Sequence, residues 1–377
     1  MIANNSINIT DLCNHQTDPF LYNLQLYYTP ILVFLGLLGN CLSMCVFFGT
    51  KLRYSSSSIY LGVLAISDSG FLIIVFVTWL KMVLVDLFNR PGFCQFFTFL
   101  AYFFSFLSVW FVVAFTIERY IAVRWPLRRQ FLCTVTRAKM TVTGLTVLAI
   151  LLNMPVIWFR EIIIFCDTKT CYSVCYLNMD RGFWASAHNN VDMFITFAVP
   201  LTMIVIFNVL IARNIYKFDH VRRTLTIESE ASNERTYIPR DRMPQTKVTK
   251  MLLLVSSAFF FLNMPAFVFR LIAFHYSECE YPKWVISTQQ MCLLLFDTSF
   301  GINFILYCAS GENFRREMIG MCTNRTSTRR SGTLIQMASH VSEFTRRYSS
   351  SKRPHSTENA QRKSSQETKK LPVNKGL

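Results

Sequence analysis

The stretch from Cys94 to Tyr120 reads CQFFTFLAYFFSFLSVWFVVAFTIERY. Its first 24 residues, up to Ile117, carry no formal charge, and the charged residues Glu118 and Arg119 follow directly. About 20 apolar residues, each rising about 1.5 Å along a helix, cross the hydrocarbon of a bilayer. This stretch is therefore predicted to span a membrane. The charged pair then lies where the helix meets water, either as an interfacial anchor or as a functional pair.

The composition extends this interpretation to most of the chain. Of its 377 residues, 52% are hydrophobic, 35 are Phe and only 16% are charged, whereas about 25% is usual in soluble domains. No internal repeat is evident, which disfavours a transporter built from duplicated halves. The sequence predicts an all-α membrane protein, a bundle of seven transmembrane helices over residues 27–49, 58–85, 92–119, 137–160, 187–214, 247–275 and 283–309.

The basic residues are unevenly distributed along the chain, whose net charge is +16. Four segments hold 31 of the 38 Lys and Arg, namely 50–57, 119–139, 213–250 and 311–377. Cytoplasmic segments of membrane proteins are enriched in these residues. The distribution therefore predicts that these segments face the cytoplasm and that the N-terminus is extracellular, and it disfavours nucleic acid as a partner. The polar segment 1–26 lacks a signal peptide's apolar core and carries predicted glycosylation sites at Asn4 and Asn8.

Motifs in several spans occur together. Glu118-Arg119-Tyr120 is followed by Pro126-Leu127, the second span holds Leu64-Ala65-Ile66-Ser67-Asp68, the sixth holds Pro265, and the seventh ends in Asn303-Phe304-Ile305-Leu306-Tyr307. Over about residues 27–322, the chain resembles rhodopsin-like (class A) G-protein-coupled receptors. The resemblance implies a non-enzymatic plasma-membrane receptor that activates heterotrimeric G proteins. Its expected coupling residues are Glu118, Arg119, Tyr120, Pro126, Leu127 and Tyr307, with Glu118 holding Arg119 at rest and Leu127 entering an apolar pocket of the G protein.

The chain departs from the family pattern at three positions. Asn208 stands where the family prefers Tyr, Asn263 replaces the Trp two residues before the proline of the sixth span, and Phe304 replaces a Pro. Phe at that last position resembles a subset of invertebrate neuropeptide receptors of the FMRFamide-like type. The departures leave the fold prediction unchanged, but they leave open how activation is transmitted.

The resemblance also implies a sodium site in the bundle interior. A mid-span carboxylate is costly to bury, so Asp68 is expected to face inward and bind a partner. The family places oxygen-bearing groups beside it, and oxygen ligands suit a hard cation. The predicted polar core consists of Asn40, Asp68, Ser108 and Asn303, and a polar core filled by water without sodium is the alternative. No other metal or cofactor is expected.

The cysteines divide by predicted side, with six on the extracellular face. An even number in an oxidising compartment permits three disulfides. The resemblance ties Cys94 to a cysteine between spans four and five, either Cys175 or Cys171. The other predicted pairs are Cys166–Cys171, across the turn of a β-hairpin expected over residues 162–175 in the second extracellular loop, and Cys13–Cys279.

The ligand class is narrowed by two positions. An amine receptor needs an Asp where this chain has Ala101, and an opsin needs a Lys where counting gives Asp297. Polar residues in the outer half of the bundle instead favour a short peptide with a cationic residue, whose charge Asp192 and Asp297 would accept while Arg270 contacts a carboxylate or amide oxygen. Two carboxylates against one guanidinium would leave the site net negative; internal Asp–Arg pairing is the alternative. The predicted ligand residues are Lys81, Tyr102, His188, Asp192, Arg270, Gln290 and Asp297.

The expected organisation is an extracellular segment 1–26, a bundle 27–309, a short amphipathic eighth helix 310–322 on the inner leaflet and a disordered cytoplasmic tail 323–377. Cys322 is a candidate palmitoylation site. The Ser/Thr-rich tail would engage receptor kinases and arrestin, and membrane lipids complete the predicted partners. The alternatives are a receptor for a non-peptide ligand such as a lipid or small molecule and, from another class, a channel or transporter.

Overall fold

The computed structural model of the chain describes residues 18–166, 171–231, 243–273 and 283–323. The chain divides into two units, Met1–Ile319 and Gly320–Leu377, and the membrane-spanning helices belong to the first. Asn4, Asn8, the predicted Cys13–Cys279 pair and the tail beyond Thr323 lie outside the described residues.

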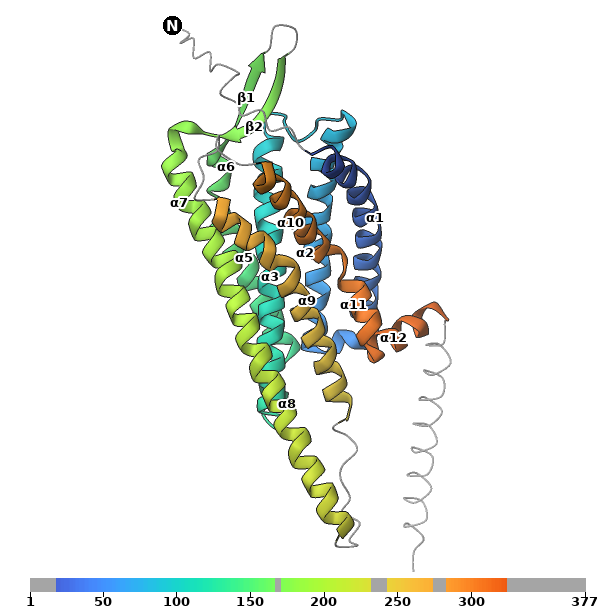
Figure 1. Ribbon diagram of the computed structural model, residues 1–377. Coiled ribbons are helices and arrows are strands. Elements are labelled where there is room, and N and C mark those ends of the chain that lie inside the picture. The colour runs from blue at the N-terminus through green and yellow to red at the C-terminus, as the bar shows by residue number, and fades with distance from the viewer. Residues whose placement is uncertain (1–17, 167–170, 232–242, 274–282, 324–377) are drawn as a thin grey trace, which may run out of the picture. The chain divides into compact units, whose positions relative to one another are not determined.

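Within this described part, six helical stretches are long and apolar enough to cross a membrane, and a seventh consists of two helices joined by a 54° bend. The predicted seven-helix bundle is therefore confirmed (Figure 1). In chain order the spans are α1 (Pro19–Gly49), α2 (Ser56–Trp79) with the 3-10 helix η3 (Leu80–Val83), α3 (Phe93–Arg124), α5 (Val135–Asn153) with α6 (Val156–Phe159), α7 (Gly182–Met193) through the π-helix η5 (Phe194–Ala198) into α8 (Val199–Ala231), α9 (Met243–Ala273), and α10 (Lys283–Gly301) with α11 (Asn303–Ser310).

Several of the predicted helix bounds are wrong, among them those at the ends of α1, α3 and α8. α1 begins at Pro19 rather than residue 27, because Asp18 caps it by accepting the Phe20 N–H at 3.0 Å. α3 continues to Arg124 past the predicted end at residue 119, and α8 continues to Ala231 past the predicted end of the fifth span at residue 214. Apolar runs indicate where a chain leaves the membrane, and the polar extension of α8 shows that a helix can continue past that boundary.

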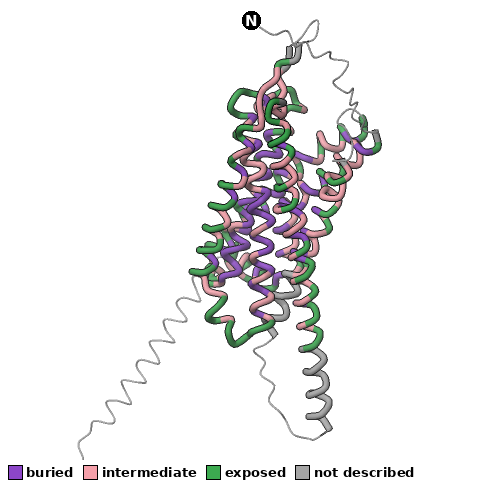
Figure 2. The backbone as a smooth tube through the Cα atoms, turned by 90° about the vertical axis from the view of Figure 1, so that its left-hand side faces the viewer, coloured by how far each residue is buried: buried purple, intermediate pink, exposed green. Residues whose placement is uncertain are grey.

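The buried residues lie on the helix faces that point into the bundle, as Figure 2 shows. α3 contributes many of them because it packs against α2, α5, α8 and α9. Phe106, Val109, Val112 and Phe115 are each at most 2% exposed. The central place of α3 explains why its sequence is decisive for the fold.

The seventh span bends between Gly301 and Asn303 although it lacks the family's proline. Gly301 lies against α1, where an added Cβ would come within 2.8 Å of Leu32. Next to this contact, Gly39 leaves room for the side chain of Phe304, whose Cβ would be 2.8 Å from a Cβ at position 39. Two glycines therefore allow α10 and α11 to approach α1 closely around the bend.

The predicted β-hairpin is confirmed between spans four and five. β1 (Arg160–Cys166) pairs antiparallel with β2 (Cys171–Leu177), and the register sets Cys166 opposite Cys171. The side chains of these two cysteines lie outside those described, so their predicted disulfide stays a prediction. The 3-10 helix η4 (Met179–Arg181) then leads into α7.

Short helices lie at the end of the bundle that carries Arg119. There η2 (Lys51–Tyr54) follows α1, and α4 (Arg129–Leu132) follows α3. The predicted amphipathic helix is α12 (Glu312–Cys322), whose buried residue Phe314 packs its ring 5.2 Å from Phe47 and 5.6 Å from Tyr307. Phe314 thereby links α12 to both α1 and α11.

Candidate functional site

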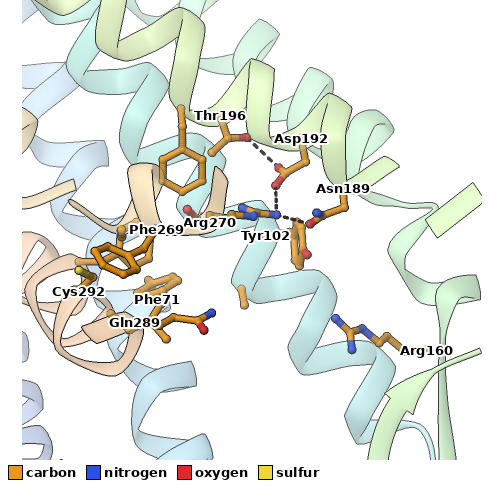
Figure 3. A pocket seen from close by; sticks show the side chains of 16 residues that line it. Phe71, Tyr102, Arg160, Asn189, Asp192, Thr196, Phe269, Arg270, Gln289 and Cys292 are labelled. Carbon is orange, nitrogen blue, oxygen red and sulfur yellow. Dashed lines mark hydrogen bonds and ion pairs between the residues drawn. The ribbon is translucent and has the colours of Figure 1, made fainter. Parts of the chain in front are cut away.

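A cavity of about 510 Å³ lies at the hairpin end of the bundle (Figure 3). Small-ligand sites are typically clefts of about 300–1,000 Å³ that combine apolar walls with a few placed polar groups, and this cavity has both properties. Its lining consists of Phe71, Ala101, Tyr102, Ser105, Arg160, Asn189, Asp192, Thr196, Phe197, Ala266, Phe269, Arg270, Gln289, Cys292, Leu293 and Phe296.

The polar wall of the cavity is organised by Asp192 of α7. Its Oδ2 lies 3.2 Å from Nη2 of Arg270 in α9, and its Oδ1 accepts a 2.9 Å hydrogen bond from Thr196. Arg270 also donates to Asn189 (Figure 3). Its guanidinium lies 5.6 Å from the ring centroid of Phe197. The Asp–Arg pairing that the sequence left as an alternative is therefore present, and it joins α7 to α9 across the cavity.

The π-helix η5 brings Thr196 and Phe197 to this wall. Pro200, the second residue of α8, has no N–H to donate to the carbonyl of Thr196, so regular helical bonding is interrupted there. A π-turn adds a residue to one helical turn and shifts the side chains that follow it. Sequence counting with a constant helical period does not include this shift.

Arg160, the first residue of β1, brings a second guanidinium to the cavity, and the sequence analysis missed it. Its carbonyl accepts a 3.1 Å hydrogen bond from Gln95 Nε2, which fixes the start of the strand against α3. The described lining therefore holds two guanidinium groups and one carboxylate, that of Asp192. The lining therefore differs from the predicted net negative site in two ways: Arg160 is added to it, and Asp297 is not part of it.

Three of the seven predicted ligand residues line the cavity, namely Tyr102, Asp192 and Arg270. Lys81 lies on η3 and Asp297 on α10, both outside the lining.

The other two predicted residues lie beside the cavity. His188 points toward α5, where its Nε2 is 3.0 Å from the carbonyl oxygen of Leu152, and its ring lies 6.2 Å from that of Tyr102. Gln289, rather than its neighbour Gln290, reaches the cavity. The predicted set therefore separates into residues at the cavity and residues around it.

The hairpin is fixed to α3 by a disulfide between Cys94 and Cys175, whose Cα atoms are 5.7 Å apart. This confirms the predicted bond and selects Cys175 over Cys171. Asn89, which the sequence analysis did not single out, reinforces the attachment: its Oδ1 accepts the Cys175 N–H at 2.8 Å, and its carbonyl accepts from Ser173 at 3.0 Å. β2 therefore has three attachments to the segment that precedes and begins α3.

A fully buried carboxylate occupies the bundle interior. Ser108 donates to Asp68 Oδ1 at 2.6 Å, and Asn303 donates to Oδ2 at 2.7 Å. Asn40 donates instead to the carbonyl of Phe300 at 3.0 Å, and its buried Oδ1 has no partner among the described residues. Asn303 presents its amide nitrogen rather than its oxygen to Asp68, whereas the carboxylate, the Ser108 hydroxyl and the unsatisfied Asn40 oxygen are of the ligand type that a hard cation such as sodium prefers.

At the opposite end of α3, Glu118 and Arg119 are both buried, with Arg119 Nη2 3.4 Å from Glu118 Oε1. The same oxygen accepts a 2.5 Å hydrogen bond from Ser57 at the start of α2. Cys133, between α4 and α5, donates its thiol to the Glu118 carbonyl at 3.8 Å. Burial raises the pKa of the Cys133 thiol, and the negative charge of Glu118 raises it further.

The other predicted coupling residues lie near this end. Tyr120 packs its ring 5.4 Å from Phe207 of α8, whereas Pro126 and Leu127 are exposed, Leu127 to 86%. Tyr307 is buried, and its hydroxyl has no hydrogen-bond partner within the described part of the chain.

Two of the residues that depart from the family pattern, Asn208 and Asn263, form hydrogen bonds. Asn208 Oδ1 of α8 accepts a 2.9 Å hydrogen bond from Ser256 of α9, so an amide–hydroxyl pair stands where the family prefers Tyr. Asn263 is 1% exposed and donates to the carbonyl of Phe259, one turn earlier, at 2.7 Å.

Comparison with known proteins identifies a family over most of the chain. Residues 39–307 match the model of the 7 transmembrane receptor (rhodopsin family). The chain is 24% identical over 367 residues to the FMRFamide receptor of Drosophila melanogaster, which covers 89% of this chain and 61% of that protein.

Two further relatives have similar identity. The thyrotropin-releasing hormone receptor of Gallus gallus is 27% identical over 311 residues, 76% of this chain and 75% of that receptor. A GQ-coupled rhodopsin of Mizuhopecten yessoensis is 25% identical over 307 residues, 80% of this chain and 60% of that protein. The chain thus spans about three fifths of the length of the Drosophila and Mizuhopecten proteins.

Proposed function

Since the chain belongs to the rhodopsin family of seven-transmembrane receptors, we propose that it binds an extracellular peptide at the plasma membrane and catalyses nucleotide exchange on a heterotrimeric G protein. The observation that carries the proposal is the cavity beneath the hairpin, where Arg160, Asp192 and Arg270 converge from three elements. Two of the relatives are receptors named for peptides, FMRFamide and thyrotropin-releasing hormone, and they support this class.

The charges of the cavity indicate how a peptide would bind. Guanidinium groups donate hydrogen bonds to carbonyl and carboxylate oxygens. Oxygens of this kind in the peptide therefore contact Arg160 and Arg270. A basic side chain of the peptide competes with Arg270 for Asp192. Binding then weakens the pair that joins α7 to α9, and the ligand shifts the population toward conformations in which α9 has moved outward.

The proposed orientation has the N-terminus and the hairpin outside the cell. The concentration of Lys and Arg at the Arg119 end supports it. In this orientation Arg119, Tyr120 and Leu127 face the G protein, and the Ser/Thr-rich tail offers sites to receptor kinases and arrestin. The inner-leaflet lipids then surround α12, where the exposed Cys322 takes a palmitoyl chain.

The proposal is tested in cells that express the chain, with G-protein dissociation as the readout and a peptide library that includes FMRFamide and thyrotropin-releasing hormone as probes. An active peptide should lose its response when the cells are loaded with a non-hydrolysable guanine nucleotide. A current that persists under that load would show a channel. Responses confined to lipids or other small molecules would show a non-peptide receptor.

A double-mutant cycle then places the peptide in the cavity. Leaving a peptide cation unpaired at a desolvated site costs about 2–5 kcal/mol, which is roughly a 30- to several-thousand-fold loss of potency. Asp192→Asn should cause such a loss for a basic peptide and a much smaller one for its neutral analogue. Asp297→Asn tests the second predicted acid in the same cycle, and Asp180→Asn, at an exposed position on η4, is the matched control. Additive losses would mean that Asp192 only pairs with Arg270.

A further inference from the structure

A groove of about 640 Å³ lies where α1, α2 and α5 meet, near the Arg119 end of the bundle and apart from the cavity under the hairpin. Its apolar part is formed by Phe48 of α1, Ile59 and Val63 of α2, and Val135 and Val142 of α5. These helices cross the membrane, so the groove is adjacent to lipid hydrocarbon.

The floor of the groove depends on a glycine. The ring of Phe48 lies against Gly62 of α2, where an added Cβ would come within 2.3 Å of that ring. Phe48 can therefore lie close to α2 while the residue remains 36% exposed. The result is an aromatic and aliphatic surface that fits an acyl chain, and burying apolar surface from both partners favours that contact.

The rim of the groove is basic. Arg53 of η2 and Lys139 of α5 belong to its lining, and both are exposed. The Arg53 guanidinium lies 4.8 Å from the ring centroid of Tyr54 and donates a 2.6 Å hydrogen bond to the Tyr54 hydroxyl, which holds it at the rim.

Nothing in the described lining neutralises these charges. The lining includes no carboxylate, and Glu118 at this end of the bundle is buried against Ser57 and Arg119. Two cations therefore stand beside an apolar surface, at the depth where α1 ends and α5 begins. A bilayer places phosphate groups at this depth and acyl chains immediately next to it.

From these charges and this surface, we infer that the groove binds an anionic glycerophospholipid. Its phosphate lies between Arg53 and Lys139, and one acyl chain lies along Phe48, Ile59 and Val63. A neutral sterol would cover the apolar surface but leave both cations without a partner, and a free phosphate ion would leave the apolar surface uncovered. A charged head joined to an apolar chain satisfies both parts.

Native mass spectrometry of the purified full chain in detergent tests this, with phosphatidylserine and phosphatidylcholine as probes. Phosphatidylserine should bind more tightly. Each basic residue near a membrane surface contributes about 1 kcal/mol to the attraction of anionic lipid, so Arg53→Gln/Lys139→Gln should weaken phosphatidylserine binding by about 30-fold. Phosphatidylcholine carries the same phosphate together with a quaternary ammonium that cancels its net charge, so the double change should weaken phosphatidylcholine binding much less than phosphatidylserine binding.

The matched control is Lys51→Gln/Arg137→Gln. It removes two exposed cations from the same elements, η2 and α5, outside the groove lining. Binding should persist in this control and in Arg53→Lys/Lys139→Arg, which keeps the charges. Val63→Trp should block binding by filling the groove with all cations present.

Three results would overturn the inference. Equal weakening by the control pair would mean diffuse attraction to any basic residue. Displacement of phosphatidylserine by an equimolar neutral sterol would mean that the occupant is a sterol. Displacement by millimolar inorganic phosphate would mean that the rim binds anions without the acyl chain.

Discussion

The hydroxyl of Ser57 in α2 donates a 2.5 Å hydrogen bond to Glu118 Oε1, the same oxygen that lies 3.4 Å from Arg119 Nη2. The carboxylate at the end of α3 is therefore held by a neighbouring helix at shorter distance than by its adjacent arginine. Any rearrangement that frees Arg119 also has to account for the bond to Ser57.

Removing that hydroxyl should activate the protein without ligand. A buried hydrogen bond to a charged group contributes about 1.5–3 kcal/mol, so Ser57→Ala destabilises the arrangement in which Glu118 is buried and should raise basal nucleotide exchange about tenfold or more. Glu118→Gln should act in the same direction. Exchange is measured per receptor at the cell surface, with Ser55→Ala as control because Ser55 makes no side-chain capping bond. Equal basal exchange in Ser57→Ala and Ser55→Ala would contradict the role of Ser57.

Arg119 should be essential for coupling rather than for folding. Arg119→Ala removes the cation proposed to meet the G protein, and ligand-stimulated exchange should fall to background with surface expression intact. Arg128→Ala, an exposed arginine of the following segment, should retain most of the response. Normal stimulated exchange by Arg119→Ala would show that coupling depends on other residues.

Sodium should lower agonist affinity through Asp68. The carboxylate already accepts bonds from Ser108 and Asn303, and a cation bound there stabilises the conformation in which these groups converge. Agonist affinity should therefore decrease as sodium replaces choline at constant ionic strength, and Asp68→Asn should remove this dependence. A sodium response that is identical in wild type and Asp68→Asn would leave a polar core without a sodium role.

Gly39 and Phe304 should be energetically coupled. A methyl group at position 39 would meet the Phe304 Cβ at 2.8 Å, and overpacking of this kind costs about 1–3 kcal/mol. Gly39→Ala should lower the melting temperature of the purified protein by several degrees, and Gly39→Ala/Phe304→Ala should lose less than the sum of the single changes. Gly144→Ala is the control because nothing lies within 4 Å of its added Cβ. Additive losses would mean that the two positions are independent.

The sequence predicted those parts of the fold and site that follow from composition and from the cost of burying charge. The seven spans follow from hydropathy. The cost of burying a carboxylate at mid-span predicted that Asp68 faces inward and binds a partner, whereas Ser108 and Asn303 as those partners followed from the family resemblance. The Cys94 disulfide followed from the resemblance, although the choice between Cys171 and Cys175 required the register of the hairpin.

There are physical reasons why Arg160, Asn89 and Ser57 could not be predicted from the sequence. Arg160 and Asn89 lie in connecting segments, whose path across the cavity is not encoded in helical periodicity. Ser57 belongs to a run of four serines, from the N-cap through the first turn of α2, that is also typical of helix capping. A length of π-helix such as η5 interrupts the regular period by which positions in the fifth span are counted, although Pro200 is a signal that could have indicated it.

The ring of Phe314 has a practical consequence for shortening the chain. It packs against Phe47 of the first helix and Tyr307 of the last, so it links the two helices through α12. A protein ended after Thr323 keeps this ring, whereas one ended after Ser310 leaves an empty space between the two helices. Expression and crystallisation work should accordingly place the C-terminal cut beyond α12, since a cut before it removes part of the bundle's own core.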